Sequence, residues 1–241
     1  DKSDIVKIVS YVERKFIGLK GGIMDQFTIN YGLKDNLILL NCSNSIFDYI
    51  NFKSESIGIV LLNTNVKHSL INSAYNDRVN ECIIAENLLN SHYSDKRRLA
   101  NYTYDELKEI KYKLNLTVYN RAKFVICENL RTLNGAELLK QSNFQGFGKL
   151  MYNSHQGLKD LYEVSCPELD FIVNYTLKLK YVLGSRMMGG GFGGCTINLI
   201  EKNKINIFLK DISNIYLDNF NKKLTPIKIS IADGLTYEKT N

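Results

Sequence analysis

Five of the six residues from 189 to 194 are glycines, in the order Gly-Gly-Gly-Phe-Gly-Gly. Glycine adopts positive φ at little cost, and its bare backbone permits tight turns and close approach by other groups. The stretches 183–188 and 195–200 on either side have the composition of short buried strands. We therefore predict an antiparallel hairpin whose tip is the glycine cluster, followed by a helix near 211–222 and a final strand at 227–231.

Two other short apolar runs, 37–42 and 57–63, are bounded by polar residues and predict further buried strands. The residues between them, 43–56, are polar, and we expect them to cross the surface near a domain boundary. Apolar residues at helical spacing predict a helix over 3–17, with Ser3 as its N-cap and an apolar face made by Ile5, Ile8, Val9, Val12 and Phe16.

The middle of the chain is predominantly helical in its apolar spacing. A long helix is predicted after residue 70, a short one from Thr103, and two more through 118–133 and 147–158. A further helix begins at Ser165 or Cys166, with Pro167 in its first turn. The predicted strands are few, mostly antiparallel by their short connections, and outnumbered by helices, so the fold class is α+β with helices packed on one face of each sheet.

Composition excludes several classes of protein. The 241 residues, 44% of them hydrophobic, suffice for one large core or two modest ones. The net charge of +6 comes from scattered lysines without a basic run interleaved with aromatics, which argues against nucleic-acid binding. No apolar stretch approaches the ~20 residues that span a bilayer, and no apolar signal region opens the chain, so we expect a cytoplasmic protein without membrane contact.

The five cysteines are widely separated and form no Cys-x-x-Cys pair, so we expect reduced, mostly buried thiols. His68 and His92 have no Cys, Asp or His neighbour at ligand spacing, and we predict no metal site built from histidines.

The stretch Gly21-Gly22-Ile23-Met24-Asp25-Gln26-Phe27 places one carboxylate among apolar neighbours after a glycine pair. Ile23, Met24 and Phe27 would partly desolvate Asp25, which favours a working base. If Asp25 starts a helix, the helix dipole opposes that effect by favouring the ionised carboxylate. On composition alone, an Asp in this setting is more often a turn residue or a helix cap.

Six motifs, in order along the chain, resemble the signatures of galactokinases in the GHMP sugar-kinase superfamily. The C-terminal one matches that family's glycine-rich motif almost residue for residue. The motifs lie at 13–18 (Glu-Arg-Lys-Phe-Ile-Gly), 22–27 (Gly-Ile-Met-Asp-Gln-Phe), 65–78 (Asn-Val-Lys-His-Ser-Leu through Asp-Arg), 147–155 (Phe-Gly-Lys-Leu-Met through Ser-His), 165–170 (Ser-Cys-Pro-Glu-Leu-Asp) and 184–196 (Gly-Ser-Arg-Met-Met-Gly-Gly-Gly-Phe-Gly-Gly-Cys-Thr).

The resemblance implies roles for several residues. Asp25 would be the catalytic base, and Gly22 would admit the sugar close to the main chain. Tyr75 would contact the sugar ring, whereas by composition alone it is a half-buried tyrosine at a helix start. The glycine loop, Gly189, Gly190, Gly191, Gly193 and Gly194, would line the active site, although the same glycines could merely permit a tight hairpin packed on another element.

Other motif residues receive no catalytic role. Arg78 could be a surface ion-pair partner, and we assign it no function. His155 is more typical of a helix-packing or hydrogen-bonding residue than of a catalyst. The family usually has Arg-Ala-Arg-His where this chain has Arg121-Ala122-Lys123-Phe124, a difference that we interpret as structural.

The family also implies ATP and Mg²⁺ as cofactors and galactose as substrate. Its Gly-Glu-His-Thr-Asp-Tyr signature and its Gly-Leu-Ser-Ser-Ser phosphate loop do not occur in this sequence. We therefore expect residues 1–52 to be the tail of an N-terminal domain and 53–241 to be a complete, helix-rich C-terminal domain with an antiparallel sheet. The first residue, Asp1, is not a Met, which suggests a processed, cleaved or truncated product.

The chain alone is expected to bind ATP poorly and to be nearly inert, because phosphoryl transfer depends on positioning and charge stabilisation. The missing N-terminal part could have been cleaved, not encoded, or supplied as a separate chain. Two alternatives remain open: a non-catalytic galactose-responsive or structural fragment, and a GHMP kinase that acts on a related sugar.

Overall fold

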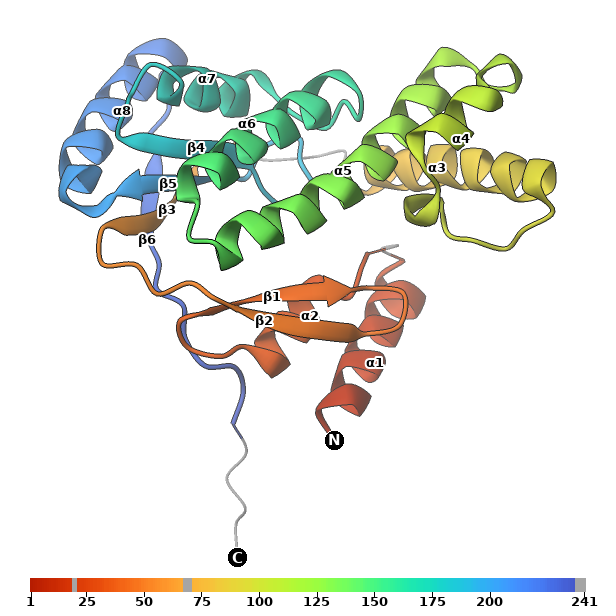
Figure 1. Cartoon of the computed structure of the whole chain (residues 1–241). Coiled ribbons are helices and arrows are strands. Elements are labelled where there is room, and N and C mark those ends of the chain that lie inside the picture. The colour runs from red at the N-terminus through yellow and green to blue at the C-terminus, as the bar shows by residue number, and fades with distance from the viewer. Residues whose placement is uncertain (19–20, 67–70, 237–241) are drawn as a thin grey trace, which may run out of the picture. The chain divides into compact units, whose positions relative to one another are not determined.

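The structure, a computed structural model, describes residues 1–18, 21–66 and 71–236. The chain forms two units, which Figure 1 draws together. Unit 1 contains Asp1–Ser54 and the C-terminal segment from Ser230, and unit 2 contains Glu55–Ile229. The predicted division after residue 52 did not include the return of the C-terminal segment to unit 1.

Unit 1 begins with helix α1 (Lys2–Val12), which continues into a π-helix, η1 (Glu13–Ile17). The predicted helix is therefore present, but its N-cap is Asp1 and not Ser3. The Asp1 side chain accepts a hydrogen bond from the Asp4 backbone N–H at 2.9 Å, and the Asp4 side chain reaches back to the N-cap, which makes a capping box.

The apolar face predicted for this helix is largely exposed within the described residues. Ile8 is 61% exposed and Phe16 is 78% exposed, whereas Val6 and Ser10 are buried. The buried side of α1 is the one that carries Val6 and Ser10. The apolar residues on its other sides are not covered by any described part of the chain.

Helix α2 (Met24–Tyr31) and a hairpin of β1 (Asn36–Asn41) and β2 (Ile46–Asn51) complete the ordered elements of unit 1. The stretch 43–56, expected to cross the surface near a domain boundary, does reach the boundary between the units at Ser54, but it also contains the unpredicted strand β2. Phe47 on β2 packs against Phe27 and Tyr31 of α2, with ring centroids 5.0 and 5.2 Å apart, and this aromatic contact holds the strand on the helix.

The C-terminal segment joins unit 1 by backbone hydrogen bonds. The Gly234 N–H donates to Gly32 O and the Leu235 N–H donates to Ile29 O, both at 2.8 Å. The Lys34 N–H donates to the Asp233 carboxylate at 2.8 Å. These bonds attach the segment to the C-terminal end of α2, the helix that carries Asp25.

Unit 2 is built on a four-stranded antiparallel sheet in the order β4-β5-β3-β6. The strands are β3 (Ile57–Asn63), β4 (Val182–Met187), β5 (Cys195–Glu201) and β6 (Thr225–Lys228). The hairpin predicted around the glycine cluster is confirmed as β4 and β5, with Met187 opposite Thr196 at its end. The last strand comes earlier than predicted, at 225–228.

Six α-helices of unit 2 surround this sheet or extend from it (Figure 1). The short 3₁₀ turns η2 (Leu99–Asn101), η3 (Lys111–Lys113) and η4 (Lys202–Lys204) connect some of them. The predicted helices are all present, although the last begins at Ile205 and not near 211. Their bounds are α3 (Ile71–Tyr93), α4 (Tyr104–Glu109), α5 (Leu116–Lys140), α6 (Phe144–Asp160), α7 (Pro167–Thr176) and α8 (Ile205–Phe220).

Two large apolar cores lie in the described part of unit 2, beside a smaller one that includes Phe124 and Met187, and together with the antiparallel sheet they confirm the α+β class. One core lies between the sheet and helices α7 and α8, and it contains Val60, Leu62, Ile172, Val182, Ile200, Phe208, Ile212, Tyr216 and Leu224. The other lies between α3, η2, α4 and α5, and it contains Ala85, Leu89, Leu99, Tyr102, Leu107, Ile110, Val118, Tyr119, Ala122 and Ile126.

Helix α6 lies against the edge strand β4 at a distance that only glycines allow. A Cβ added to Gly148 would lie 1.9 Å from Leu183 O, and one added to Gly184 would lie 2.5 Å from Gly148 Cα. The backbones of helix and strand therefore touch, and α6 covers the free edge of the sheet.

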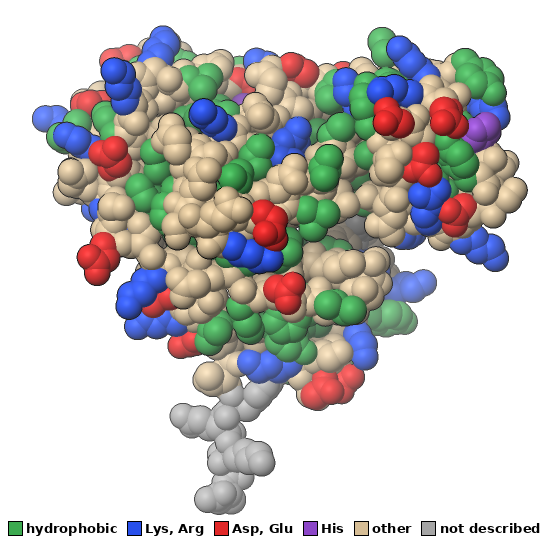
Figure 2. Space-filling view, in the orientation of Figure 1, with side chains coloured by type: hydrophobic (Ala, Val, Ile, Leu, Met, Phe, Trp, Pro, Cys, Tyr) green, Lys and Arg blue, Asp and Glu red, His purple; other side chains and the backbone are tan. Residues whose placement is uncertain are grey.

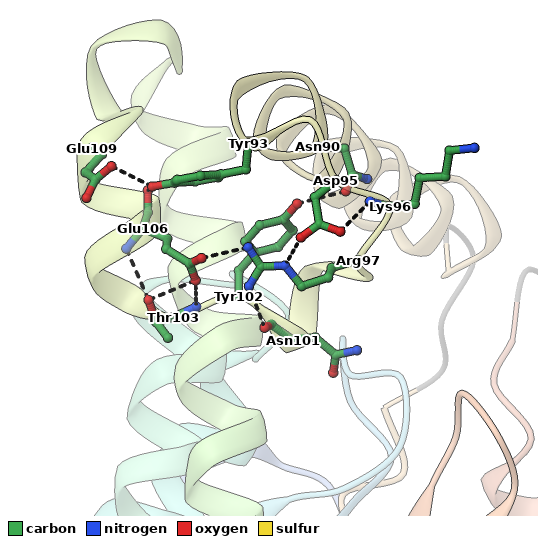
Figure 3. Close-up of polar contacts among 10 residues, drawn as sticks. All are labelled: Asn90, Tyr93, Asp95, Lys96, Arg97, Asn101, Tyr102, Thr103, Glu106 and Glu109. Carbon is green, nitrogen blue, oxygen red and sulfur yellow. Dashed lines mark hydrogen bonds and ion pairs between the residues drawn. The ribbon is translucent and has the colours of Figure 1, made fainter.

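The connection between α3 and α4 is held by the polar cluster of Figure 3. The Arg97 guanidinium pairs with Asp95 and with Glu106, the latter at 2.7 Å, and lies 4.1 Å from the Tyr102 ring centroid. The Tyr93 hydroxyl donates to Glu109 at 2.6 Å, and this hydrogen bond raises the pKa of Tyr93 to about 12. The cluster joins the end of α3 to α4.

Acidic side chains lie among the basic ones on the face of the molecule seen in Figure 2. In the part of the chain that the structure describes, no helix is both long and apolar enough to cross a membrane.

Candidate functional site

The glycine loop between β4 and β5 adopts a backbone that most residues avoid. Gly189, Gly191, Gly193 and Gly194 have φ of 77°, 87°, 133° and 73°. Phe192 also has positive φ, 59°, and its ring packs into a core with Phe124, Leu158, Val164, Leu169 and Met187. The left-handed conformation explains four of the five glycines.

Val164 anchors the loop from outside the hairpin. The Phe192 N–H donates to Val164 O at 2.6 Å, and a Cβ added to Gly191 would lie 2.2 Å from the same oxygen. At the other end of the loop, Gly194 O accepts from the Thr64 N–H at 2.9 Å and from the Thr64 hydroxyl at 2.8 Å. The alternative that these glycines permit a tight, packed hairpin is therefore correct for Gly191.

Gly190 differs from its neighbours. Its φ is not in the left-handed region, and a Cβ added there would lie 3.6 Å from Tyr75 Cδ2, an ordinary van der Waals contact. Neither conformation nor crowding requires a glycine here. The ring of Tyr75, half-buried in the first turns of α3, thus lies beside the tip of the loop, and two predicted site elements that are far apart in the sequence meet in unit 2.

Two arginines tie α3 and α5 to the segment that precedes α7. Arg78 donates from Nε to Tyr162 O at 2.7 Å and from Nη1 to Glu81 at 3.0 Å. Arg121, on α5, donates to the same Glu81 oxygen at 3.1 Å and to Glu163 at 2.8 Å.

Arg121 is 2% exposed, and its third donor bonds Leu161 O at 2.5 Å. Burial lowers the pKa of Arg121, but its hydrogen bonds to Glu163 and Glu81 outweigh burial and leave it raised, so the guanidinium is charged. This role of Arg121 has no signal in the sequence, because nothing in a lone Arg on a helix shows that carboxylates from two other segments will surround it.

His155 lies in a hydrogen-bonded structural position, as predicted. Its Nε2 is 3.2 Å from Asp170, and its Nδ1 accepts from the Met187 N–H at 3.2 Å. Although burial raises the pKa of Asp170, hydrogen bonds from His155, Ser165 and Lys159 lower it to about 2. These contacts fix the start of α7 to the end of β4.

Asp25 and Gly22 lie in unit 1. Asp25 is in the first turn of α2, as expected, but its side chain is exposed, and Met24 beside it is 59% exposed. The expectation that apolar neighbours desolvate Asp25 is therefore wrong for the described residues. The reason is the helical phase, which directs Gln26, Phe27 and Asn30 into the unit and leaves Asp25 outside.

The residues before α2 hold its start in place. Arg14 donates from Nε and Nη2 to Gly21 O at 3.3 and 3.2 Å, and the Gln26 amide donates to Glu13 at 2.5 Å. No described atom lies within 4 Å of a Cβ added to Gly22, and its φ is not left-handed. The main chain before Asp25 is therefore open.

Metal ligands are not gathered in the described ranges, where no group of three or more His, Cys, Asp or Glu side chains could hold an ion. His68 lies outside the described residues, and His92 Nδ1 is 3.4 Å from Lys113 Nζ. The cysteines are free thiols, with Cys42 exposed and the other four half-buried, so they are less buried than expected.

Comparison with known proteins agrees with the motifs. Residues 136–216 match the GHMP kinases C terminal family. A galactokinase of Thermotoga neapolitana is 40% identical over 234 residues, 97% of this chain, and one of Clostridium tetani is 40% identical over 243 residues, 99% of this chain. The crystal structure of Lactococcus lactis galactokinase complexed with galactose matches with a TM-score of 0.92 at 30% identity, over 97% of this chain.

By sequence and by fold, this chain resembles the galactokinases of the GHMP kinase superfamily. It spans 64% of the Thermotoga neapolitana relative and 60% of the Clostridium tetani and Lactococcus lactis proteins. Leishmania major mevalonate kinase in complex with R-mevalonate shares the fold at a TM-score of 0.58 and 16% identity. The predicted resemblance to galactokinases and the predicted fold class are thus confirmed. The galactokinase-like chain covers about three fifths of the length of these galactokinases.

Proposed function

We propose that this galactokinase-like chain contributes the sugar-binding and base-supplying part of a kinase that transfers the γ-phosphoryl group of ATP to the C1 hydroxyl of galactose. The observation that carries the proposal is the similarity to galactokinases over at least 97% of the chain, with a TM-score of 0.92 to a galactokinase complexed with galactose. The domain assignment, with 1–52 as the tail of an N-terminal domain and 53–241 as a complete C-terminal domain, is part of this proposal.

Within the proposal, Asp25 takes the proton from the C1 hydroxyl as that oxygen attacks the γ-phosphorus. Its side chain is exposed in the first turn of α2, where a substrate hydroxyl can reach it. The open main chain at Gly22 leaves room for a sugar beside it. In unit 2, the ring of Tyr75 would offer an apolar face and a hydroxyl to the sugar beside Gly190, where a Cβ would lie 3.6 Å from the ring.

The described residues do not fit a magnesium site, since they gather no set of carboxylates. We propose that ATP is held mainly by residues outside this chain, in a segment joined to it or supplied separately. Phosphoryl transfer relies on such charge stabilisation, so the chain alone should turn over slowly or not at all.

Calorimetry separates the proposal from its rivals. Galactose and ATP are titrated into the chain alone and into the chain mixed with the N-terminal segment of a relative. We expect galactose binding and turnover with the segment present, and loss of ~10² to 10⁴ in rate for Asp25→Asn. Normal turnover by Asp25→Asn would refute the assignment of Asp25 as the catalytic base. Galactose binding without any turnover would favour a non-catalytic regulatory protein. Preference for another sugar in a substrate panel would favour a kinase for a related sugar.

A further inference from the structure

Arg121 stands out among the charged residues of the galactokinase-like chain. It is the only Lys, Arg, Asp or Glu in the described ranges whose side chain is fully buried. Burying a charge costs free energy that its ion pairs barely recover, and apolar residues of similar volume often stabilise a protein equally well. Such a group therefore calls for an explanation other than stability.

The contacts of Arg121 and Arg78 converge on the same two elements. Each guanidinium bonds the Glu81 carboxylate on α3, and each bonds the segment 161–163, at Leu161 O and Glu163 for Arg121 and at Tyr162 O and Glu163 O for Arg78. Arg121 also brings in α5. Four directional bonds to 161–163 fix that short segment relative to α3 more closely than apolar packing would.

The next residue after this segment is Val164, whose carbonyl accepts from the Phe192 N–H and contacts Gly191. The adjacent Gly190 lies beside the Tyr75 ring, one turn before Arg78 on α3. The path of contacts from Tyr75 through the loop tip, Val164 and the two arginines therefore returns to α3, and it includes the Tyr75–Gly190 pair of the proposed sugar subsite.

We infer that Arg78 and Arg121 are positioning residues that set the gap between the Tyr75 ring and the glycine-loop tip, and so tune recognition of the sugar. This inference rests on the proposed function for the identity of the sugar. It concerns residues that touch neither the reacting atoms nor, in the proposal, the substrate.

Amide exchange on the whole chain tests the geometry without any ligand. In Arg121→Met and Arg78→Met, we expect the Phe192 amide to exchange about tenfold faster or more, after correction for global stability from the Leu199 amide in β5. Arg121→Lys, which keeps the charge but not the forked donors, should lie between these variants and the wild type.

Arg97→Met is the matched control. Arg97 also pairs with two carboxylates and stacks on an aromatic ring (Figure 3), but its partners lie between α3 and α4, and none of them belongs to the glycine loop or to 161–163. Its loss should lower global stability and leave the corrected exchange of Phe192 unchanged. Unchanged Phe192 exchange in both Arg78→Met and Arg121→Met, or an equal rise in Arg97→Met, would overturn the inference.

Galactose titration followed by calorimetry supplies the second readout, with the N-terminal segment present. We expect the Kd for galactose to rise about tenfold in Arg121→Met and to stay at the wild-type value in Arg97→Met, with partial recovery in Arg121→Lys. Equal affinity in all variants would refute the positioning role. A wild-type protein that binds no galactose would instead refute the proposed function. The amide-exchange measurement would still show whether Arg78 and Arg121 hold the glycine loop in place.

Discussion

The glycine loop allows a graded test, because three neighbouring glycines have different structural reasons to be glycine. Gly190→Ala meets only an ordinary contact, Gly189→Ala meets open space at a φ of 77°, and Gly191→Ala meets Val164 O at 2.2 Å with a φ of 87°. An alanine in the left-handed region costs roughly 1–2 kcal/mol. Overpacking against a fixed neighbour adds about 1–3 kcal/mol, and a less flexible unfolded chain returns about 0.4–1 kcal/mol.

These terms predict an order of stability. Gly190→Ala should be neutral or slightly stabilising, Gly189→Ala should lose on the order of 1 kcal/mol, and Gly191→Ala should lose on the order of 2–4 kcal/mol. Urea unfolding followed by far-UV circular dichroism measures the differences, with equal m values as the check that all three variants unfold alike. A Gly191→Ala variant as stable as Gly189→Ala would show that Val164 does not anchor the loop.

Three further changes test other parts of the structure. The pKa of Asp170 in the folded protein, about 2, lies below its ordinary value of 3.8. The ionised carboxylate therefore adds to the free energy of unfolding above pH 3.8, and this stabilisation is lost as the pH falls toward 2. Urea unfolding across that range should show a loss of stability, on the order of 1–2 kcal/mol, that Asp170→Asn lacks. Gly148→Ala would place Cβ 1.9 Å from Leu183 O, so thermal unfolding should occur several degrees lower. Gly234→Ala would place Cβ 2.7 Å from the Gly32 nitrogen, so the amide of Gly234 should exchange faster in that variant while β-sheet amides of unit 2 keep their rates.

Elements with a strong local signal were predictable from the sequence. The glycine hairpin, the apolar strand at 57–63 and the helix with Pro167 in its first turn were found because turn chemistry and capping depend on neighbours in the chain. Strand β2 pairs with β1 and packs on α2 through residues that favour a strand, since 46, 47, 49 and 50 are Ile, Phe, Tyr and Ile, but these lie within a stretch, 43–56, that is polar overall. No periodicity within so short a stretch indicates such a non-local partner.

The candidate site divides in the same way. The glycine loop could be singled out from residue types, and the motif containing Tyr75 from its resemblance to the galactokinase signature. Their meeting at Gly190 depends on how α3 packs against the β4–β5 hairpin. Arg78 was expected as a possible ion-pair partner, and it does pair with Glu81 three residues later, although its side chain is mostly buried and not on the surface. The place of Arg121 could not be predicted, since its partners Glu81 and Glu163 lie about 40 residues away in the sequence. The burial expected of Asp25 failed because it depends on helical phase and on what surrounds α2, which the neighbours in sequence do not determine.

The glycines show how fold and function can be separated in this chain. Gly148, Gly184 and Gly191 are required because another backbone or side chain occupies the place of a Cβ, and Gly189 and Gly194 because of their φ. Gly22 and Gly190 meet neither condition, since both could carry a methyl group without strain among the described residues. Because the fold does not require a glycine at either position, a substitution there should affect ligand binding without affecting stability. If Gly190→Ala keeps full stability and full galactose affinity, the space beside Tyr75 is not used by a sugar.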